Sequence, residues 1–376
     1  MKPRRTGLVW HERYMWHEQG LYSGLMPTGY PVQLGRHHEH PETKRRLKNL
    51  LDACEFTPTL VNVPARAATR EELLTVHTPG YLDRLDALDA GHGGEAGFDA
   101  PFTPGSVAIA RLAAGGCLEA LDAVLDGSVD NVYCLVRPIG HHAEPDSGKG
   151  FCLYSNAALV ARRALARGLK RVALVDIDVH HGNGAERAFW HDPDVLTVSL
   201  HQSHWFPPDS GDTAAVGEGP GHGFNLNVPL PAGSGFGAYQ AAFEQVVLPA
   251  LEQFKPELVV MPAGYDAGAQ DPLGRMILSS NHFRWITEQL LAVADRHAGG
   301  RFIATHEGGY NESTVPFMGL AVIEAMAGRA SGVVDPYGAI FDGMEGHALL
   351  PHQQAAVDAA AANLALLEAG LARGAR

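Results

Sequence analysis

The sequence predicts an α/β fold, in which a mainly parallel β-sheet carries helices on both faces. From about residue 132 to residue 327, short apolar runs rich in β-branched residues alternate with longer helical patterns. A strand followed by a helix and another strand requires a crossover connection, which is typical of parallel sheets. The 376 residues suffice for one large domain or two ordinary ones. Because no composition break, linker or internal repeat divides them, we expect a single domain over residues 1–376.

The N-terminal part of the chain is predicted to begin with a short strand and to continue mainly as helices. The strand covers residues 8–10, and the helices cover residues 43–53, 70–77, 81–88 and 104–125. The basic residues of the first helix are expected to face water. The loop over residues 91–101 is too rich in glycine for regular structure, and the pair Gly115-Gly116 indicates close helix packing.

Histidines gather in the loop between about residues 20 and 41. The stretch His37-His38-Glu39-His40 has side chains that suit a metal site, but no second ligand group lies nearby in the sequence. We therefore interpret this stretch as a solvated surface or rim.

The alternating part of the chain supplies most of the predicted sheet. Its strands cover residues 132–136, 172–177, 195–200, 224–228, 258–261 and 302–304. Its helices cover residues 155–167, 184–191, 239–254, 282–296 and 315–327. A last, alanine-rich helix over about residues 353–371 is expected to pack on the outside of the domain.

Composition and charge limit the classes of function. Hydrophobic residues make up 45% of the chain and charged residues 19%, which is ordinary for a soluble globular protein. The formal net charge of −13 argues against nucleic-acid binding, which needs a basic face, and is compatible with cationic small molecules or basic peptides. The four cysteines form no CxxC pair and no disulfide framework, so we expect reduced thiols and a cytoplasmic location. Neither a signal peptide nor a membrane span is expected.

One stretch, residues 171–184, organises the predictions about chemistry. Its apolar run over residues 172–175 is typical of a buried strand, and Asp176, Asp178 and His180 follow at every second position. In an extended chain this spacing places the three side chains on one face. Two carboxylates and an imidazole crowded at the end of a buried strand are poorly solvated unless a cation joins them. The pattern therefore favours a divalent metal site over a strand end with solvated acids and a chance histidine.

Polar residues follow five of the predicted strands, at the edge where open α/β sheets bind ligands. The stretches are Arg137-Pro-Ile-Gly-His-His-Ala143, Asp176 to His180, Ser199-Leu-His201, Ala263-Gly-Tyr-Asp266 and His306-Glu-Gly-Gly-Tyr310. Asp178, His180 and Asp266 would leave one coordination position open, as in catalytic rather than structural zinc sites. Zinc is favoured, while Fe²⁺, Co²⁺ and Mn²⁺ also suit two carboxylates. Asp176 is free to orient a neighbouring histidine.

Two histidines and a tyrosine near the same edge suit amide hydrolysis. This reaction needs a base that takes a proton from water and an acid that protonates the leaving amine. The pKa of histidine suits both tasks, so His141 and His142 are candidates. Tyr310 follows a glycine pair, from which its hydroxyl could donate to an oxyanion. The alternatives are an exposed histidine pair and a tyrosine that caps the core.

These segments resemble, in their order along the chain, the zinc-dependent histone deacetylase and acetylpolyamine amidohydrolase superfamily. The bacterial class II deacetylase-like amidohydrolases are the most similar branch, and the resemblance covers about residues 5 to 330. The matching segments are His40-Pro-Glu-Thr-Lys44, Arg137-Pro-Ile-Gly-His-His142, Lys149-Gly-Phe-Cys152, Asp176-Ile-Asp-Val-His-His-Gly-Asn-Gly184, Ser199-Leu-His-Gln202, Phe206-Pro-Pro208, Asn227-Val-Pro-Leu-Pro231, Ala263-Gly-Tyr-Asp-Ala267, Asp271-Pro-Leu273 and Glu307-Gly-Gly-Tyr310.

The resemblance implies an arginase/deacetylase-type α/β fold with one central, mainly parallel sheet of about eight strands. It implies zinc on Asp178, His180 and Asp266. It also implies a buried, structural potassium ion in the region of Asp176, Ser199 and Leu200.

Catalytic roles are implied by the same resemblance. His142 would be the general base and acid, and His141 its electrostatic partner, held by Asp176. Tyr310 would polarise the scissile carbonyl. Asn183 stands where class I members carry an aspartate beside the second histidine, so His142 lacks a full negative partner. Class II-like members share this asparagine.

The implied substrate is acyl-lysine in a peptide or a small acylated amine, with an acetyl or other short acyl group. Phe151 and Phe206 would form the walls of a narrow channel, and Asp99 would grip the substrate backbone at its rim. Gly150 and Gly309 are the remaining candidates for substrate binding. An acetylpolyamine is the alternative substrate, and a homo-oligomer stays open.

Two other classes of protein are alternatives, and two positions depart from the family pattern. A non-catalytic metal-binding homologue is one alternative, and an arginase-like dimetal enzyme, which would need an aspartate in place of Gly182, is the other. Ile139 replaces a common proline. Lys149 stands where relatives often carry an uncharged residue. Its ammonium would either repel a cationic substrate at the channel mouth, face solvent, or pair with Glu144 or Asp146.

Overall fold

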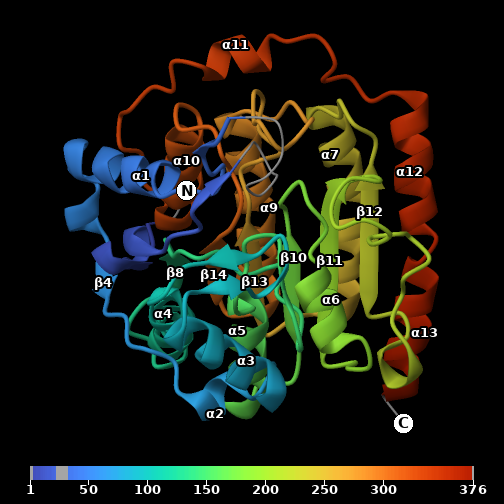
Figure 1. Ribbon diagram of the computed structural model, residues 1–376. Coiled ribbons are helices and arrows are strands. Elements are labelled where there is room, and N and C mark those ends of the chain that lie inside the picture. Colours follow the sequence, from blue (N-terminus) through green and yellow to red (C-terminus); the bar gives the residue numbers. More distant parts are fainter. Residues whose placement is uncertain (1–2, 23–32, 375–376) are drawn as a thin grey trace.

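The computed structural model describes residues 3–22 and 33–374. Within this part of the chain, the centre is a sheet of eight parallel strands (Figure 1). In spatial order these are β12 (Asn225–Leu230), β11 (Val195–Gln202), β10 (Val172–Asp176), β13 (Leu258–Ala263), β14 (Phe302–His306), β8 (Asn131–Cys134), β1 (Thr6–Val9) and β4 (Val61–Val63). The prediction of a mainly parallel sheet of about eight strands is confirmed, and β4 is the strand that the sequence patterns missed.

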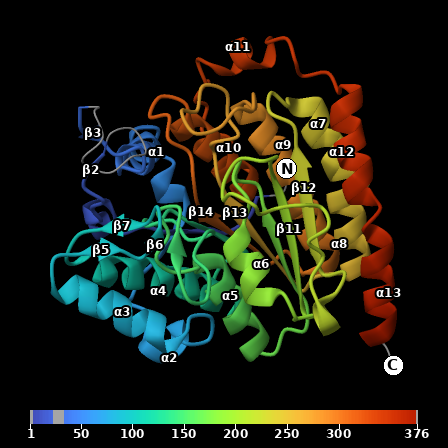
Figure 2. The ribbon, with the colours of Figure 1, turned by 45° about the vertical axis from the view of Figure 1, so that its right-hand side comes forward.

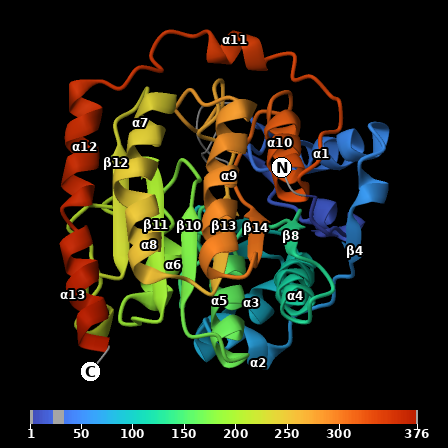
Figure 3. The same ribbon diagram turned by 180° about the vertical axis from the view of Figure 1, so that it is seen from behind.

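Helices cover both faces of this sheet (Figures 1 and 3). One face carries α4 (Ser106–Leu125), α5 (Asn156–Ala166) and α6 (Asn183–Phe189), with α3 (Pro79–Ala90) and α2 (Arg70–Leu73) outside them. The other face carries α8 (Leu248–Phe254), α9 (Ser280–His297) and α10 (Val315–Ala327), with α1 (Glu42–Ala53) packed on α10. At the β12 edge lie α7 (Phe236–Ala242), α12 (Pro351–Ala361) and α13 (Leu364–Gly374), and the short α11 (Gly338–Asp342) comes directly before α12 in the chain.

The central strands are buried on both faces. In β10, Val172 and Leu174 belong to the apolar cluster on the side of α4 and α5, whereas Ala173 and Val175 belong to the cluster on the side of α9 and α10. Burial on both faces explains why this strand is continuously apolar instead of alternating. The first polar side chain, Asp176, comes where the strand ends.

Several predicted elements differ from those observed. The helix expected over residues 70–77 is shortened to α2, and the C-terminal helix is divided into α12 and α13. The helix expected over residues 239–254 contains a π-turn, Phe243–Val247, between α7 and α8. Pro249 follows this turn, and its ring nitrogen has no N–H to donate to the preceding turn.

The glycine-rich loop was predicted to be irregular, but it forms three short strands beside α3 (Figure 2). They are β5 (Gly94–Glu95), β6 (Gly97–Phe98) and β7 (Pro101–Phe102). β6 pairs in parallel with β9 (Gly148–Lys149), and β5 pairs with β7. A further short antiparallel pair joins β2 (Leu21–Tyr22) to β3 (Gly35–Arg36). Pairing with a segment about fifty residues away orders β6, and a local pattern does not reveal such a partner.

The histidine-rich stretch is half buried, so its interpretation as a solvated surface or rim is wrong for His37 and Glu39, whereas His38 and His40 are partly exposed. His37 and Glu39 are no more than 3% exposed. Glu39 accepts hydrogen bonds from Arg137 Nε at 2.9 Å and from Lys44 Nζ at 3.2 Å. Lys44 is itself buried, contrary to the expectation that the basic residues of α1 face water. A buried carboxylate needs such cationic partners, and Arg137 lies 98 residues further along the chain.

The glycine pair in α4 allows close packing, as predicted. A Cβ atom on Gly115 would overlap with the carbonyl oxygen of Arg66, and one on Gly116 would lie 2.6 Å from the hydroxyl of Tyr14. The segment before α2 and the N-terminal segment therefore pack directly on the α4 backbone.

Among the described residues, one helical stretch has the length and apolar character of a membrane span, although none was expected. It covers Pro351–Arg373, which includes α12 and α13. It lies along the β12 edge of the sheet (Figure 1), and Asp358 and Glu368 fall within it. One such stretch is weak evidence for a membrane span, because core helices of soluble proteins meet the same criteria of length and composition.

Candidate active site

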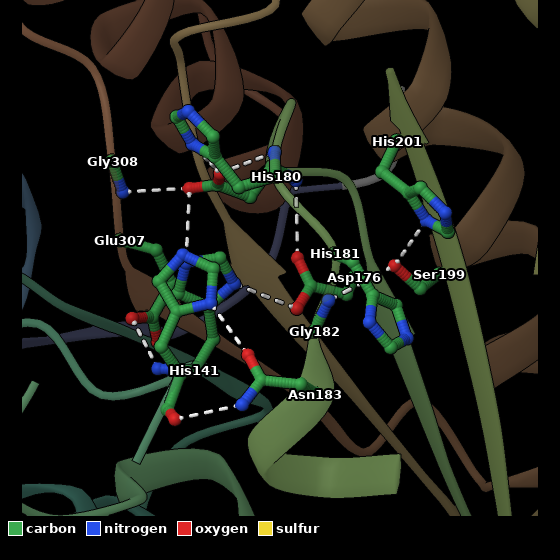
Figure 4. Close-up of polar contacts among 12 residues, drawn as sticks. His141, Asp176, His180, His181, Gly182, Asn183, Ser199, His201, Glu307 and Gly308 are labelled. Atoms are coloured by element: carbon green, nitrogen blue, oxygen red, sulfur yellow. Dashed lines mark hydrogen bonds and ion pairs between the residues drawn. The ribbon is translucent and has the colours of Figure 1, made fainter. Parts of the chain in front are cut away.

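The reactive side chains predicted from the sequence meet at the carboxyl edge of the sheet. β10, β13 and β14 are adjacent, and the residues directly after them supply carboxylates, imidazoles and backbone N–H groups to one buried site (Figure 4). Parallel alignment causes this convergence, since it brings the same end of every strand to one edge.

Asp178, His180 and Asp266 form a candidate metal site, with one ligand atom from each lying within 4.8 Å of the others. His180 Nδ1 is 3.0 Å from Asp178 Oδ1 and 3.1 Å from Asp266 Oδ2. Asp266 Oδ2 is buried and accepts no hydrogen bond of good geometry from the described residues. Two buried carboxylates around one imidazole leave an excess of negative charge that a divalent cation would neutralise. The donor set therefore fits such a cation.

Glycines make room for these carboxylates. A Cβ atom on Gly264 would overlap with Asp178 Oδ2, and one on Gly308 would overlap with Asp266 Oδ2. Backbone groups bind the outer oxygens: Gly308 N donates to Asp178 Oδ2, and Val179 N donates to Asp266 Oδ1, both at 2.8 Å. These bonds leave Asp178 Oδ1 and Asp266 Oδ2 turned toward the nitrogen of His180.

His141 has a carboxylate partner. Its Nδ1 lies 3.0 Å from Asp176 Oδ2, and both side chains are buried (Figure 4). Burial by itself would lower the pKa of His141, but the charges of Asp178 and Asp176 outweigh it and raise the pKa to about 10. A Cβ atom on Gly182 would overlap with Asp176 Oδ2, so the position that an arginase-like site would fill with aspartate is closed to any side chain.

His142 has a neutral partner instead. Its Nδ1 lies 2.7 Å from Asn183 Oδ1, and its ring stands edge-on to Phe206 with 4.9 Å between the ring centroids. Burial lowers the pKa of His142, and the neighbouring His141 and His180 lower it further. His142 is therefore a neutral imidazole that can accept a proton.

Tyr310 is placed by Gly309 and by Asp271. Gly309 has a φ of +118°, a conformation that favours glycine. The backbone N–H of Tyr310 donates to Asp271 Oδ2 at 2.8 Å, and Leu273 N donates to Asp271 Oδ1 at 2.8 Å. Burial raises the pKa of the Tyr310 hydroxyl, and the charges of Asp266 and Asp178 add to the effect. The phenol therefore stays protonated and is available as a donor.

A narrow cavity of about 200 Å³ opens onto these groups. It is lined by Asp99, His142, Gly150, Phe151, His180, Trp205, Phe206, Leu273 and Tyr310. Gly150 has a φ of +48°, and a Cβ atom there would overlap with the ring of His142 and lie 2.7 Å from Phe206 Cε1. Glycine at this position keeps the passage open. Gly309 is not part of the lining and acts through the placement of Tyr310.

Asp99 lies at the rim of the cavity. It has a φ of +55°, and its carbonyl oxygen accepts a hydrogen bond from Phe151 N at 2.7 Å, which joins the rim to the channel wall. Burial raises the pKa of Asp99 to about 6, with a further contribution from Glu95. The neighbouring Phe98 is exposed and stacks on Phe206.

The region that resembles a potassium site lies behind the metal ligands. Asp176 and Ser199 are partners in the register of β10 and β11. Ser199 Oγ accepts a hydrogen bond from Gly182 N at 3.2 Å and lies 2.9 Å from His201 Nδ1 (Figure 4).

Three acidic residues that orient the site were not assigned a role from the sequence. Asp271 binds the backbone of Tyr310, and Glu307 Oε2 accepts hydrogen bonds from Gly140 N at 2.7 Å and His141 N at 3.1 Å. Both stand in the motif segments, Asp271-Pro-Leu273 and Glu307-Gly-Gly-Tyr310, which was the available signal. Glu144 is the third: it was expected only as a possible ion-pair partner of Lys149, and its contact with Asn183 was not foreseen.

Lys149 pairs with Glu144, which was one of its expected alternatives. Lys149 Nζ lies 2.7 Å from Glu144 Oε1. Lys149 is not among the residues that line the cavity. The ammonium is therefore directed away from the path of a substrate.

Fold and site together define an amide-cleaving hydrolase with a candidate metal centre. Residues 37–326 match the model of the histone deacetylase domain. The chain belongs to the histone deacetylase family.

Sequence similarity to individual proteins of this family covers most of the chain. The sequence is 50% identical to a histone deacetylase-like amidohydrolase of Pseudomonas aeruginosa, across 89% of both proteins. It is 38% identical to histone deacetylase 8 of Arabidopsis thaliana over 87% of this chain and 89% of that protein, and 34% identical to a probable deacetylase of Archaeoglobus fulgidus over 86% of both. The crystal structure of the HDA15 HD domain has a TM-score of 0.81 at 30% identity, covering 98% of this chain and 97% of that one.

Proposed function

We propose that this protein is a zinc-dependent amidohydrolase that removes an acetyl or other short acyl group from an acylated amine such as acyl-lysine. The observation that carries the proposal is that His142 and Tyr310 line the same narrow cavity as His180, one of the three residues of the candidate metal site. A base, an oxyanion donor and a set of cation ligands thus share one space of substrate size.

The side chains divide the work as follows. A bound divalent cation would polarise the amide carbonyl and activate water as a Lewis acid. His142 Nε2 would take a proton from the attacking water and return it to the leaving nitrogen. Tyr310 Oη would donate to the carbonyl oxygen as negative charge develops there. His141, held by Asp176, would place positive charge beside His142, and Asn183 would orient the His142 ring.

The ions are part of the proposal. Zinc is the proposed cation because an imidazole and two carboxylates with an open position suit a catalytic zinc site, and Fe²⁺, Co²⁺ and Mn²⁺ are the alternatives. A structural potassium ion near Asp176, Ser199 and Leu200 is proposed from the resemblance to the family.

The shape of the cavity supports an acylated aliphatic amine as the substrate. Phe151 and Phe206 provide aromatic walls, which bury methylene groups without requiring hydrogen bonds. Gly150 leaves the passage between them open. At the rim, the carboxylate of Asp99 would accept an N–H group from the substrate backbone.

An acetylpolyamine is the second candidate substrate, and the charge of the rim favours it. Asp99 and Glu95 place two carboxyl groups near the channel mouth. Lys149, the cation that would repel a second ammonium group, is paired with Glu144. A polyamine would therefore meet negative charge at the mouth.

The proposal also covers the domain organisation, the cellular location and the partners of the protein. Residues 1–376 would act as one catalytic domain in the cytoplasm, on peptides or small molecules and not on nucleic acids or membranes. The net charge of −13 supports this choice of partners. A homo-oligomer is compatible with the fold.

The test is hydrolysis by metal-stripped protein reloaded in turn with Zn²⁺, Fe²⁺, Co²⁺ and Mn²⁺. The substrates are an acetyl-lysine peptide and a monoacetylated diamine, and released acetate is measured. We expect metal-dependent turnover, with the ratio of kcat/KM values deciding between the two substrates. Binding of acetyl-lysine without turnover under any metal would indicate a non-catalytic homologue and overturn the proposal.

A further inference from the structure

A row of side chains connects His142 with the surface of the protein. His142 Nδ1 lies 2.7 Å from Asn183 Oδ1, and Asn183 Nδ2 donates to Glu144 Oε1 at 2.7 Å. Lys149 Nζ donates to the same oxygen of Glu144 at 2.7 Å. His142 and Asn183 are each 3% exposed, whereas the side chains of Glu144 and Lys149 are 14% and 22% exposed.

The contacts of Asn183 allow one orientation of its amide group. Asn183 Nδ2 donates to Glu144 Oε1 and also to the carbonyl oxygen of His142, at 3.1 Å. A flipped amide would place Asn183 Oδ1 against these two oxygens, which carry no proton to share. The carboxylate of Glu144 contributes most to this preference because it is charged and its bond is the shorter one.

The orientation of the amide determines the tautomer of His142. Because Asn183 presents its oxygen to His142 Nδ1, that nitrogen must carry the proton in the neutral ring. The lone pair is then on Nε2, on the opposite side of the ring, and the ring lines the cavity. A base for water in the cavity needs this tautomer.

His141 is also held with a proton on Nδ1, but its partner is a carboxylate instead of an amide. Its Nδ1 faces a carboxylate, Asp176 Oδ2, at 3.0 Å. Both oxygens of a carboxylate are acceptors, so rotation of Asp176 does not change what it offers to the ring. An amide has one acceptor side and one donor side, so Asn183 needs a neighbour to set its direction.

We infer that Glu144 is a positioning residue for the reaction proposed above: it orients Asn183, and so holds His142 as the Nδ1–H tautomer with Nε2 free toward the cavity. Lys149 holds Glu144 in place. Lys149 therefore acts through Glu144 on the orientation of His142, and not on the selection of substrate. The inference rests on the proposed function only in its kinetic consequence.

The backbone explains how Lys149 comes to hold Glu144. Glu144 N donates to Ser147 O at 2.8 Å, and this hydrogen bond closes a turn in the segment between Glu144 and Lys149. Lys149 belongs to β9, which is paired with β6, so its backbone is fixed independently of the ion pair. The ion pair then turns the Glu144 carboxylate toward Asn183.

The first test reads the tautomer directly. Zinc-loaded protein with ¹⁵N-labelled histidine rings is examined by NMR, and the His142 signals are assigned by their loss in His142→Ala. We expect an Nδ1–H pattern in the native protein, a mixture of both tautomers in Glu144→Met, and the native pattern in Glu144→Gln, which keeps an acceptor. Asp146→Ala, an exposed acid in the same turn, is the matched control and should retain the native pattern.

The second test is kinetic. Glu144→Met should lower kcat by about 10- to 100-fold, the usual cost of removing an outer partner that orients a functional histidine, with little change in KM. Lys149→Met should lower kcat by about two- to fivefold, in keeping with a partly exposed ion pair. In Glu144→Met/Asn183→Asp, either carboxylate oxygen can accept from Nδ1, so both the Nδ1–H pattern and most of kcat should return.

The outcomes separate the inference from the proposed function. If the native protein hydrolyses no acylated amine but Glu144→Met shifts the tautomer, the proposed function fails and the inference stands. If the native protein is active and Glu144→Met keeps the native tautomer, the inference is wrong. It is also wrong if the double variant restores neither the tautomer nor kcat. Circular dichroism and thermal unfolding verify the fold, and Glu144→Ala replaces Glu144→Met should the latter not fold.

Discussion

The floor and the walls of the cavity are built in different ways. His180 and Tyr310 form the floor, with Asp178 and Asp266 beside His180, and each of the four follows the end of a central strand within a few residues. Backbone N–H groups from neighbouring strand ends bind the two carboxylates, as Gly308 N binds Asp178. The parallel sheet therefore sets the positions of the groups that would perform the chemistry.

The walls consist of Gly150, Phe151 and Phe206, with Asp99 at the rim, and they belong to loops. Asp99, Gly150 and Phe151 have φ values of +55°, +48° and +70°, and the short pair of β6 and β9 holds their segments together. The difference teaches that the candidate reactive groups are positioned by the sheet, whereas the cavity walls lie on loop segments that only tertiary contacts order. Changes to the floor should therefore remove activity, whereas changes to the walls should alter how a substrate is bound.

The largest expected effect comes from the cation ligands. Asp178→Ala, His180→Ala and Asp266→Ala should each lose the metal and reduce hydrolysis to the uncatalysed background, because the remaining two side chains leave the cation too few ligands. Elemental analysis after gel filtration measures the metal. Asp358→Ala, which removes an exposed carboxylate on α12, should retain a full complement. Full metal retention in all three ligand variants would mean that the site has been placed wrongly.

Substitutions at the two reacting side chains should come next. Tyr310→Phe should keep metal and fold and lower kcat by about 10²–10³-fold, the usual cost of one oxyanion donor. His142→Ala should lower kcat by at least ~10²-fold through the loss of acid–base catalysis. Steady-state kinetics on an unactivated acetyl-amide measures both. Near-native kcat in either variant would contradict the role given to that residue.

A substitution in the cavity wall should lower activity less, and it should act by changing the shape of the cavity. Gly150→Ala should lower kcat/KM by about 10-fold, because its Cβ would displace the ring of His142 or Phe206 and change the reacting geometry. Gly127→Ala is the matched control: Gly127 also has a positive φ, +73°, but nothing lies within 4 Å of its added Cβ. It should destabilise the fold by about 1 kcal/mol and leave kcat/KM unchanged. Equal kinetic effects in the two variants would show that backbone strain, and not the channel, is responsible.

At the rim, the effect should fall on substrate binding and depend on pH. The pKa of Asp99 is raised to about 6, so its carboxylate is ionised above that pH and becomes protonated below it. KM for an acetyl-lysine peptide should therefore rise several-fold as the pH falls from 7.5 to ~5, while kcat changes less. In Asp99→Asn the KM should be raised throughout and lose this dependence. A native KM that stays constant across this range would remove Asp99 from substrate binding.

The smallest expected effect concerns stability. Burial raises the pKa of Glu307 to about 7, above the ordinary value of 4.5. The folded state then holds a proton that the unfolded state has released, so this contribution to stability is complete below pH 4.5 and is lost as the pH rises to about 7. Glu307→Gln should flatten this part of the curve of unfolding free energy against pH, as measured by denaturant titration. Parallel curves for the two proteins would show that Glu307 does not titrate in this range.

The alternating strands and helices and the carboxyl-edge position of the polar segments could be predicted from the sequence. Asp176, Asp178 and His180 were assigned to one site because a period of two identifies one face of an extended chain. The fold of the glycine-rich loop could not be predicted, because β6 takes its hydrogen bonds from β9. The burial of Glu39 depended in the same way on Arg137, whose cationic side chain compensates the buried carboxylate.

The sequence by itself determined the strands of the sheet other than β4, their parallel direction and the candidate cation ligands, because these follow from the local pattern of apolar residues and from the residues that follow each strand. Only the tertiary structure decided the partners of those groups. Glu144 accepts a hydrogen bond from Asn183, and Lys149 forms an ion pair with Glu144 instead of lining the channel. The physical reason is that hydrogen bonds and ion pairs depend on distances of a few ångströms between segments far apart in the chain, and local patterns carry no information about those distances.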